Sequence, residues 1–369
     1  MDIDIDVILR HEVYLDKLNS GFIDEDINPQ LSDMFREIKA YIDANGLPRT
    51  LKQLESMEAT INKIIVTQSP WENYTNNLMR SALYETGYMN TALSNQDLTV
   101  PGIKTTRTFI GQQLMALESS SGARVGFWNS FIQGNITNSQ ERVNNAVRDG
   151  FARGQSISAV LRDIRQQFAG PIQTDAVKLA RTAFVHYTQQ ARRAMVAENP
   201  NYYQEAIFVA VWDNRTSLTC RGFSGTRWKA NDRELPIPPL HYHCRSTLVY
   251  GPTGFKLVGG RAAIGGREGE AAEKKFTSRS RLTGKKPEYK GKKDLGIFKP
   301  EEFTTRKQHE NWLAEQPRWF VDSALGKTRA ALFLDGNLEL KRFTDMTGAT
   351  LTLDQLRVAD ADAFTKAGL

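Results

Sequence analysis

The spacing of apolar residues changes at Pro200, and the change divides the chain into a helical part and a part that contains strands. Before Pro200, the most regular run repeats at a spacing of about 3.6 residues, which places its apolar side chains on one face of a helix. Its members after Asp175 are Ala176, Leu179, Ala180, Ala183, Phe184, Tyr187, Ala191, Ala194 and Met195. After Pro200, the apolar runs at 206–212 and 246–250 are typical of buried strands. The pattern therefore predicts an α+β fold, with a mainly helical N-terminal half followed by a small module of two or three short strands.

Further helices are predicted from the same spacing and from residues that start or stop helices. Three segments with helical periodicity precede residue 100, at 31–44, 51–66 and 71–89. We expect Thr137 or Asn138 to cap a later helix, because short polar side chains satisfy the first amide groups of a helix. Ser156 is expected to begin the next helix, and Gly170–Pro171 to end it.

The C-terminal segment regains apolar order, in a pattern that favours a hairpin followed by a helix. Two apolar runs, 331–334 and 338–343, flank Asp335–Gly336, and this arrangement is typical of two strands joined by a turn. A short helix is expected to begin near Thr352, with Leu356 facing the core. Together with the preceding part of the segment, this predicts a small C-terminal α+β region.

Charge is distributed very unevenly along the chain. Residues 1–60 carry 13 acidic and six basic side chains, whereas residues 256–299 carry 13 basic and five acidic ones. The whole chain has a net charge of +6, so the short basic segment alone exceeds it. Such a concentration favours a polyanion or an acidic partner. The clustered cations are Lys274, Lys275, Arg279, Arg281, Lys285, Lys286, Lys290, Lys292 and Lys293.

The basic segment also has the composition of a flexible arm, because it is rich in Gly and poor in aliphatic residues. Its cations suit the neutralisation of DNA phosphates, and a solubilising linker or an arm for an acidic protein surface is the alternative. Three other arginines, Arg181, Arg192 and Arg193, are expected on the solvated face of their helix. The length of 369 residues predicts about two or three domains. We divide the chain into a helical region at 1–135, the module at 136–251, the basic arm at 252–299 and the C-terminal region at 300–369.

Several protein classes are disfavoured by composition. The longest apolar run has seven residues, whereas a membrane span needs about 20. The N-terminus is acidic and lacks the basic start of a secretory signal, so we expect synthesis in the cytoplasm. Two cysteines do not make the disulfide framework of a small secreted protein.

The densest group of reactive side chains lies in the small module. Cys220 and Cys244 are the only cysteines, and two of the five histidines, His241 and His243, lie beside Cys244. Two thiolates and an imidazole could complete a zinc site, with Cys220, His241 and Cys244 as candidate ligands. A disulfide in a particle that leaves the cell, a pair of buried structural thiols, and a cysteine nucleophile activated by histidine are the alternatives. The residues alone leave these readings open.

The motifs of this module resemble the phage head morphogenesis family, the minor head proteins typified by phage Mu protein F and its SPP1 counterpart. The resemblance lies in an Arg-Thr pair on a helix, in Asp-Asn-Arg-Thr followed by a cysteine, and in Pro-Pro-Leu-His-Tyr-His-Cys-Arg-Ser. The matching residues are Arg181, Thr182, Asp213, Arg215, Thr216, Cys220, Pro239, His241, Cys244 and Arg245. Many members have cysteines where this chain has Ser217 and Ser246, a departure that bears on any zinc site. Residues 1–130 resemble no family that we can name.

The resemblance implies a structural, non-enzymatic minor capsid protein of a tailed bacteriophage or prophage, present in few copies. Its expected partners are the portal protein, a capsid or scaffolding protein and phage double-stranded DNA during packaging or ejection. The chain is then expected in the virion, in the head interior or at the portal vertex, after assembly in the host cytoplasm. The rivals from other classes are a toxin-like transferase or cysteine hydrolase, and a zinc-dependent nucleic-acid-binding module. Apart from zinc, we expect no cofactor.

Overall fold

The computed structural model describes two compact units. One comprises His11–Asn199 and His241–Cys244, and the other Met1–Arg10, Pro200–Leu240 and Arg245–Leu369. The residues whose structure is described are 1–93, 98–117, 124–211, 216–258, 306–316, 318–344 and 350–369. The described residues are mainly helical with a few small sheets, so the predicted α+β class is confirmed.

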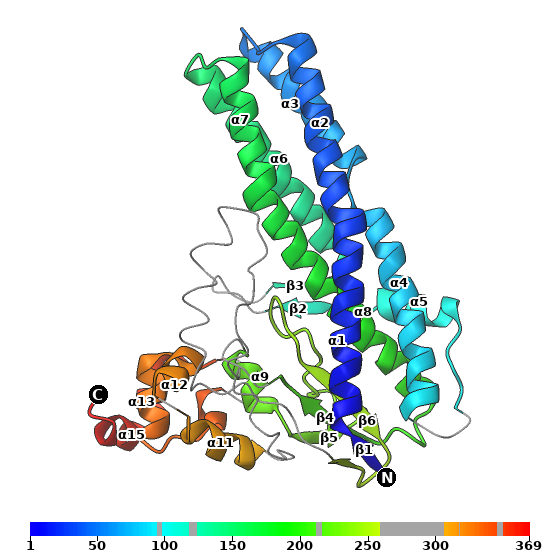
Figure 1. Cartoon of the computed structure of the whole chain (residues 1–369), viewed down its shortest axis with the longest axis vertical. Helices are drawn as coiled ribbons and strands as arrows, with labels where there is room; N and C mark the ends of the chain where they lie inside the picture. The colour runs from blue at the N-terminus through cyan, green and yellow to red at the C-terminus, as the bar shows by residue number, and fades with distance from the viewer. Residues whose placement is uncertain (94–97, 118–123, 212–215, 259–305, 317, 345–349) are drawn as a thin grey trace, which may run out of the picture. The chain divides into compact units, whose positions relative to one another are not determined.

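The first unit is a bundle of long helices (Figure 1), and its buried apolar side chains form a core. Its elements are α1 (Ile5–Phe22, which begins in the other unit), η1 (Ile23–Ile27), α2 (Asn28–Asn45), α3 (Leu51–Thr67), α4 (Trp71–Tyr88), η2 (Met89–Leu93), α5 (Ile103–Gly111), α6 (Trp128–Ala152), α7 (Ile157–Gln167), η3 (Phe168–Ile172) and α8 (Gln173–Glu198). Helix α8 contacts α4, α5 and α6, and α6 in turn contacts α3 and α7. A short hairpin of β2 (Met115–Leu117) and β3 (Arg124–Gly126) precedes α6. The three early segments and the run after Asp175 therefore form helices as predicted.

The two ends predicted for the helix after Ser156 have different outcomes. Ser156 caps α7 as expected, and its Oγ accepts a bond of 3.3 Å from the amide of Ala159. The predicted stop at Gly170–Pro171 is wrong, because the π-helical turn η3 carries the chain into α8. A π-helical turn is wider than an α-helical one, and it accommodates the missing N–H and the ring of Pro171.

Helix α6 begins earlier than its sequence predicts. Thr137 and Asn138, the expected caps, lie inside this helix, which starts at Trp128. The start is stabilised by tertiary contacts: Trp128 packs edge-on against Trp71 with 5.5 Å between the rings, and its Nε1–H donates to Thr75 Oγ1 over 3.0 Å. These partners lie more than 50 residues away in the sequence, so the local pattern could not indicate them.

The second unit contains the predicted small sheet. β4 (Glu205–Val209) is the central strand and pairs antiparallel with β5 (Arg227–Lys229) and β6 (Thr247–Gly251). The two strands predicted from apolar runs are therefore confirmed as β4 and β6. The short helix α9 (Leu218–Phe223) lies between β4 and β5 in the sequence.

A second small sheet joins the N-terminus to the start of the predicted basic arm. β1 (Asp2–Asp4) pairs in parallel with β7 (Lys256–Val258), and Ile3 lies opposite Leu257 in the register. Both side chains are buried. The rest of the arm from residue 259 onward, with all nine clustered cations, lies outside the described residues.

The C-terminal region is helical where it is described, so the predicted hairpin is wrong. Its elements are α11 (Arg306–Ala314), α12 (Arg318–Leu325), α13 (Lys327–Leu334), the 3₁₀ turn η4 (Leu340–Phe343), α14 (Leu353–Ala359) and α15 (Ala361–Lys366). Residues 331–334 form the end of α13, because a four-residue apolar run fits a buried helix as well as a strand. The helix predicted near Thr352 is confirmed: Thr352 and Gln355 form a reciprocal capping box, and Leu356 is fully buried. None of the described helices is long and apolar enough to cross a membrane.

Candidate functional site

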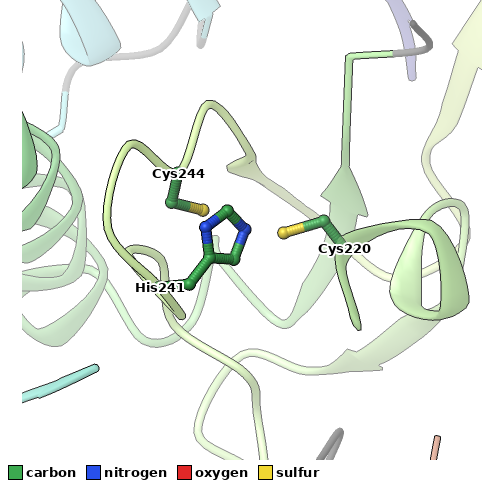
Figure 2. Close-up of side chains that lie close together, drawn as sticks. All are labelled: Cys220, His241 and Cys244. Atoms are coloured by element: carbon green, nitrogen blue, oxygen red, sulfur yellow. The ribbon is translucent and has the colours of Figure 1, made fainter. Parts of the chain in front are cut away.

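Two cysteines and one histidine come together in the small module. The sulfur atoms of Cys220 and Cys244 and a ring nitrogen of His241 all lie within 4.8 Å of one another. Figure 2 shows the imidazole ring between the two sulfur atoms, with both thiols pointing toward it. Cys220 and Cys244 are 1% and 2% exposed, His241 is half-buried, and both cysteines are thiols. The structure therefore brings Cys220 together with His241 and Cys244, which lie more than 20 residues after it in the sequence.

Helix α9 positions Cys220 through its first turn. Ser217 caps the helix, and its Oγ accepts a bond of 3.2 Å from the amide of Cys220. Beside it, the buried side chain of Arg221 donates from Nε to the carbonyl of Thr216 over 3.0 Å. Thr216 in turn donates from Oγ1 to the carbonyl of Val211 over 2.5 Å. Thr216 of the family motif thus holds the approach to the helix that carries Cys220.

The loop that carries His241 and Cys244 is held on α8. The amide of His243 donates to Thr182 Oγ1 over 3.4 Å, and the Lys178 ammonium lies 4.0 Å from the centre of the Tyr242 ring. The amide of Cys244 also donates to the carbonyl of His241 over 3.2 Å, which closes a tight turn. Thr182 of the Arg-Thr motif therefore has a structural role, as an acceptor for the loop.

The structure distinguishes the two neighbouring histidines. His241 Nδ1 lies 2.8 Å from the carbonyl oxygen of Tyr242. A carbonyl can only accept, so Nδ1 is the donor in this contact. His243 is exposed and has a left-handed backbone with φ of 59°. The ring is nevertheless partly desolvated, and this desolvation, with the charges of Arg181 and Lys178 and the nearby His241, lowers the pKa of His243. The chain thus places one of the two histidines, His241, in the cluster.

The other predicted motif residues differ in how far they are buried. Pro239 is buried and follows a cis peptide bond, whereas Arg181 and Arg245 are exposed. Asp213 and Arg215 lie outside the described residues. Among the described motif residues, the cluster itself contains Cys220, His241 and Cys244.

Arg192 departs from its predicted position on a solvated face. It is 4% exposed and contacts two carboxylates, with Nε 2.7 Å from Glu85 and a terminal nitrogen 2.7 Å from Glu12. Glu85 is fully buried and also accepts from His11 Nε2 over 2.7 Å, and the His11 ring stacks on Tyr88 at 3.5 Å. This network ties α1 and α4 to α8. Sequence reasoning missed it because the partners lie 107 and 180 residues from Arg192.

The chemistry available to the cluster follows from its donors and its burial. Two cysteine sulfurs and an imidazole are ligands for zinc or another borderline-soft metal. A catalytic thiol is normally exposed in part, so that a substrate can reach it. The near-complete burial of Cys220 and Cys244 therefore favours a structural role over nucleophilic catalysis.

Comparison with known proteins finds one family to which part of the chain is similar. Residues 141–249 match the model of the family described as phage Mu protein F like protein. The matched segment contains Thr182, Cys220, His241 and Cys244, and it covers less than half of the chain. No curated protein and no solved structure matches the chain. The resemblance to the phage head morphogenesis family is thus confirmed for this segment.

Proposed function

We propose that this chain is a minor head protein of a tailed bacteriophage or prophage, with a structural role in head assembly. The observation that carries the proposal is the match of residues 141–249 to the phage Mu protein F family model. The burial of both thiols in the matched segment supports a structural role. In this proposal the protein is part of the virion, in the head interior or at the portal vertex.

The uneven distribution of charge suggests which partner each part of the chain binds. The helical N-terminal part has its own apolar core, so it can present a rigid surface to the portal or to a capsid or scaffolding protein. The cations at 274–293 are suited to phosphate groups, because lysine and arginine neutralise the DNA backbone irrespective of its sequence. We therefore propose that the portal protein, or a capsid or scaffolding protein, binds the helical part and that packaged DNA contacts the arm.

A complementation experiment tests the structural role. A phage or prophage with an early stop codon in this gene is grown with and without the full chain supplied in trans. A synonymous change at the same codon is the matched control. We expect few infectious, DNA-filled particles without the chain and a restored yield with it. Equal yields of infectious particles in all three cultures would contradict the proposal.

A further inference from the structure

We propose that Cys220, His241 and Cys244 bind one Zn²⁺ ion as three protein ligands, with the fourth coordination position taken by a ligand from outside this group. Among the His, Cys, Asp and Glu side chains of the described residues, those of Cys220, His241 and Cys244 lie close enough together to hold a metal ion. The inference concerns the folded chain itself and does not depend on the proposed role in the head.

The donor set fits zinc better than the hard cations. Thiolate sulfur and imidazole nitrogen are the ligands of structural zinc sites, whereas Mg²⁺ and Ca²⁺ prefer oxygen. Cys220 and Cys244 are nearly fully buried, and cysteine binds zinc as the thiolate. A metal ion supplies the positive charge that the two deprotonated sulfurs require.

The distances leave room for the ion after a small contraction. With Zn–S bonds of about 2.3 Å and a Zn–N bond of about 2.0–2.1 Å, a tetrahedral site places its ligand atoms roughly 3.5–3.8 Å apart. The three donor atoms of the cluster already lie within 4.8 Å of one another. The donor atoms therefore need to approach one another by no more than about an ångström to reach these spacings.

The histidine is prepared for metal binding by its own loop. Zinc-binding histidines usually donate the second ring N–H to a carbonyl or carboxylate, which fixes the tautomer and the ring orientation. Nδ1 of His241 makes such a bond to the carbonyl of Tyr242 over 2.8 Å. Nε2 is then the ring nitrogen that we propose as the ligand atom.

The same arrangement argues against a disulfide. A disulfide requires the two sulfur atoms to lie about 2.05 Å apart. Figure 2 shows the imidazole ring of His241 between the sulfurs of Cys220 and Cys244, so a disulfide requires the ring to leave. A metal ion instead binds all three side chains after the small contraction described above.

Metal analysis of the purified full chain tests the proposal. The chain is prepared under reducing conditions, loaded with Zn²⁺, dialysed and measured for zinc by plasma mass spectrometry, and we expect about one zinc per chain. Cys220→Ser, His241→Gln and Cys244→Ser should each reduce the bound zinc at least tenfold. His243→Gln is the matched control and should keep the wild-type stoichiometry, because His243 lies outside the cluster.

Cobalt substitution gives a readout that does not depend on the variants folding. Co²⁺ bound to the wild-type chain should show thiolate-to-metal charge-transfer absorption and the intense visible bands of a tetrahedral site, and Zn²⁺ should displace it. Wild-type protein that holds no zinc after loading, or a cobalt spectrum without thiolate bands, would overturn the proposal. Loss of zinc from His243→Gln together with its retention by His241→Gln would also overturn it.

Discussion

Replacement of Arg192 by methionine should strongly destabilise the helical unit. Methionine has a similar length and no charge, so the change leaves Glu85 buried with His11 as its remaining hydrogen-bond partner among the contacts described above. Removal of one partner from a buried ion pair costs about 3–5 kcal/mol of the free energy of unfolding. For a unit of about 190 residues, each kcal/mol corresponds to roughly 2–4 °C in Tm, so we expect a decrease of about 6–20 °C.

Thermal and urea unfolding followed by far-UV circular dichroism measure this loss, because the unit is mainly helical. Arg148→Met is the matched control: Arg148 also makes two short bonds to one carboxylate, Glu58, but its side chain is 55% exposed. The Glu58 side chain is 12% exposed, whereas that of Glu85 is fully buried. Because Arg148 itself lies in solvent, this variant should lose about 1 kcal/mol, well below the loss in Arg192→Met. Glu85→Gln combined with Arg192→Met should recover part of the loss, because no unpaired charge remains buried. Equal, small effects of Arg192→Met and Arg148→Met would refute the reasoning.

The same network predicts how stability depends on pH. Burial by itself raises the pKa of Glu85, but Arg192 and His11 outweigh it, so the folded-state pKa is lower than usual. The ionised carboxylate therefore stabilises the fold at neutral pH, and this contribution is lost as the pH falls from the ordinary glutamate pKa through the folded-state pKa. In Arg192→Met, burial dominates and the pKa of Glu85 should rise, so stability should be lost at a higher pH than in the wild type. Identical acid unfolding midpoints in the two proteins would contradict this.

Three further predictions concern packing, the arm and a helix cap. Gly150→Ala should lower the free energy of unfolding, measured by urea denaturation, by about 1–3 kcal/mol, because the new Cβ would lie 2.2 Å from Val160 Cγ2. Adding Val160→Ala should relieve the clash. Unchanged stability of the single variant would be inconsistent with this packing. Deletion of 267–299 should weaken DNA binding and flatten its decrease with salt in fluorescence anisotropy, whereas an unchanged affinity would exclude the arm as the DNA contact. Thr352→Ala should lower the free energy of unfolding by about 1 kcal/mol, because the capping box of α14 is lost. Amide hydrogen exchange in residues 353–356 should increase locally. Unchanged exchange there would argue against the cap.

The features that sequence could predict are those that depend on neighbours in the chain. The apolar period of α8 and the caps at Ser156 and Thr352 are local, and each is found where it was expected. The three members of the cysteine–histidine cluster could also be named, because both cysteines and two histidines lie in one short module. Which histidine joins the cluster depends on the turn of the loop, and in this structure it is His241.

The errors share a physical cause, which is tertiary context. Arg192 looks solvated on a helical wheel, and its burial becomes evident only with Glu85 and Glu12 beside it. The start of α6 at Trp128 depends on Trp71 and Thr75, which belong to another helix. Residues 331–334 have a pattern too short to separate strand from helix, so the surrounding helices decide their conformation.

The most direct test of the structural role is to locate the chain in particles. Heads from a lysate are separated into procapsids and DNA-filled heads on density gradients, and each fraction is analysed by quantitative mass spectrometry against the major capsid protein. The account predicts peptides from the chain in at least one head fraction, at a few copies per particle. Their absence from every head fraction, with the chain found in the soluble fraction of the same lysate, would contradict it.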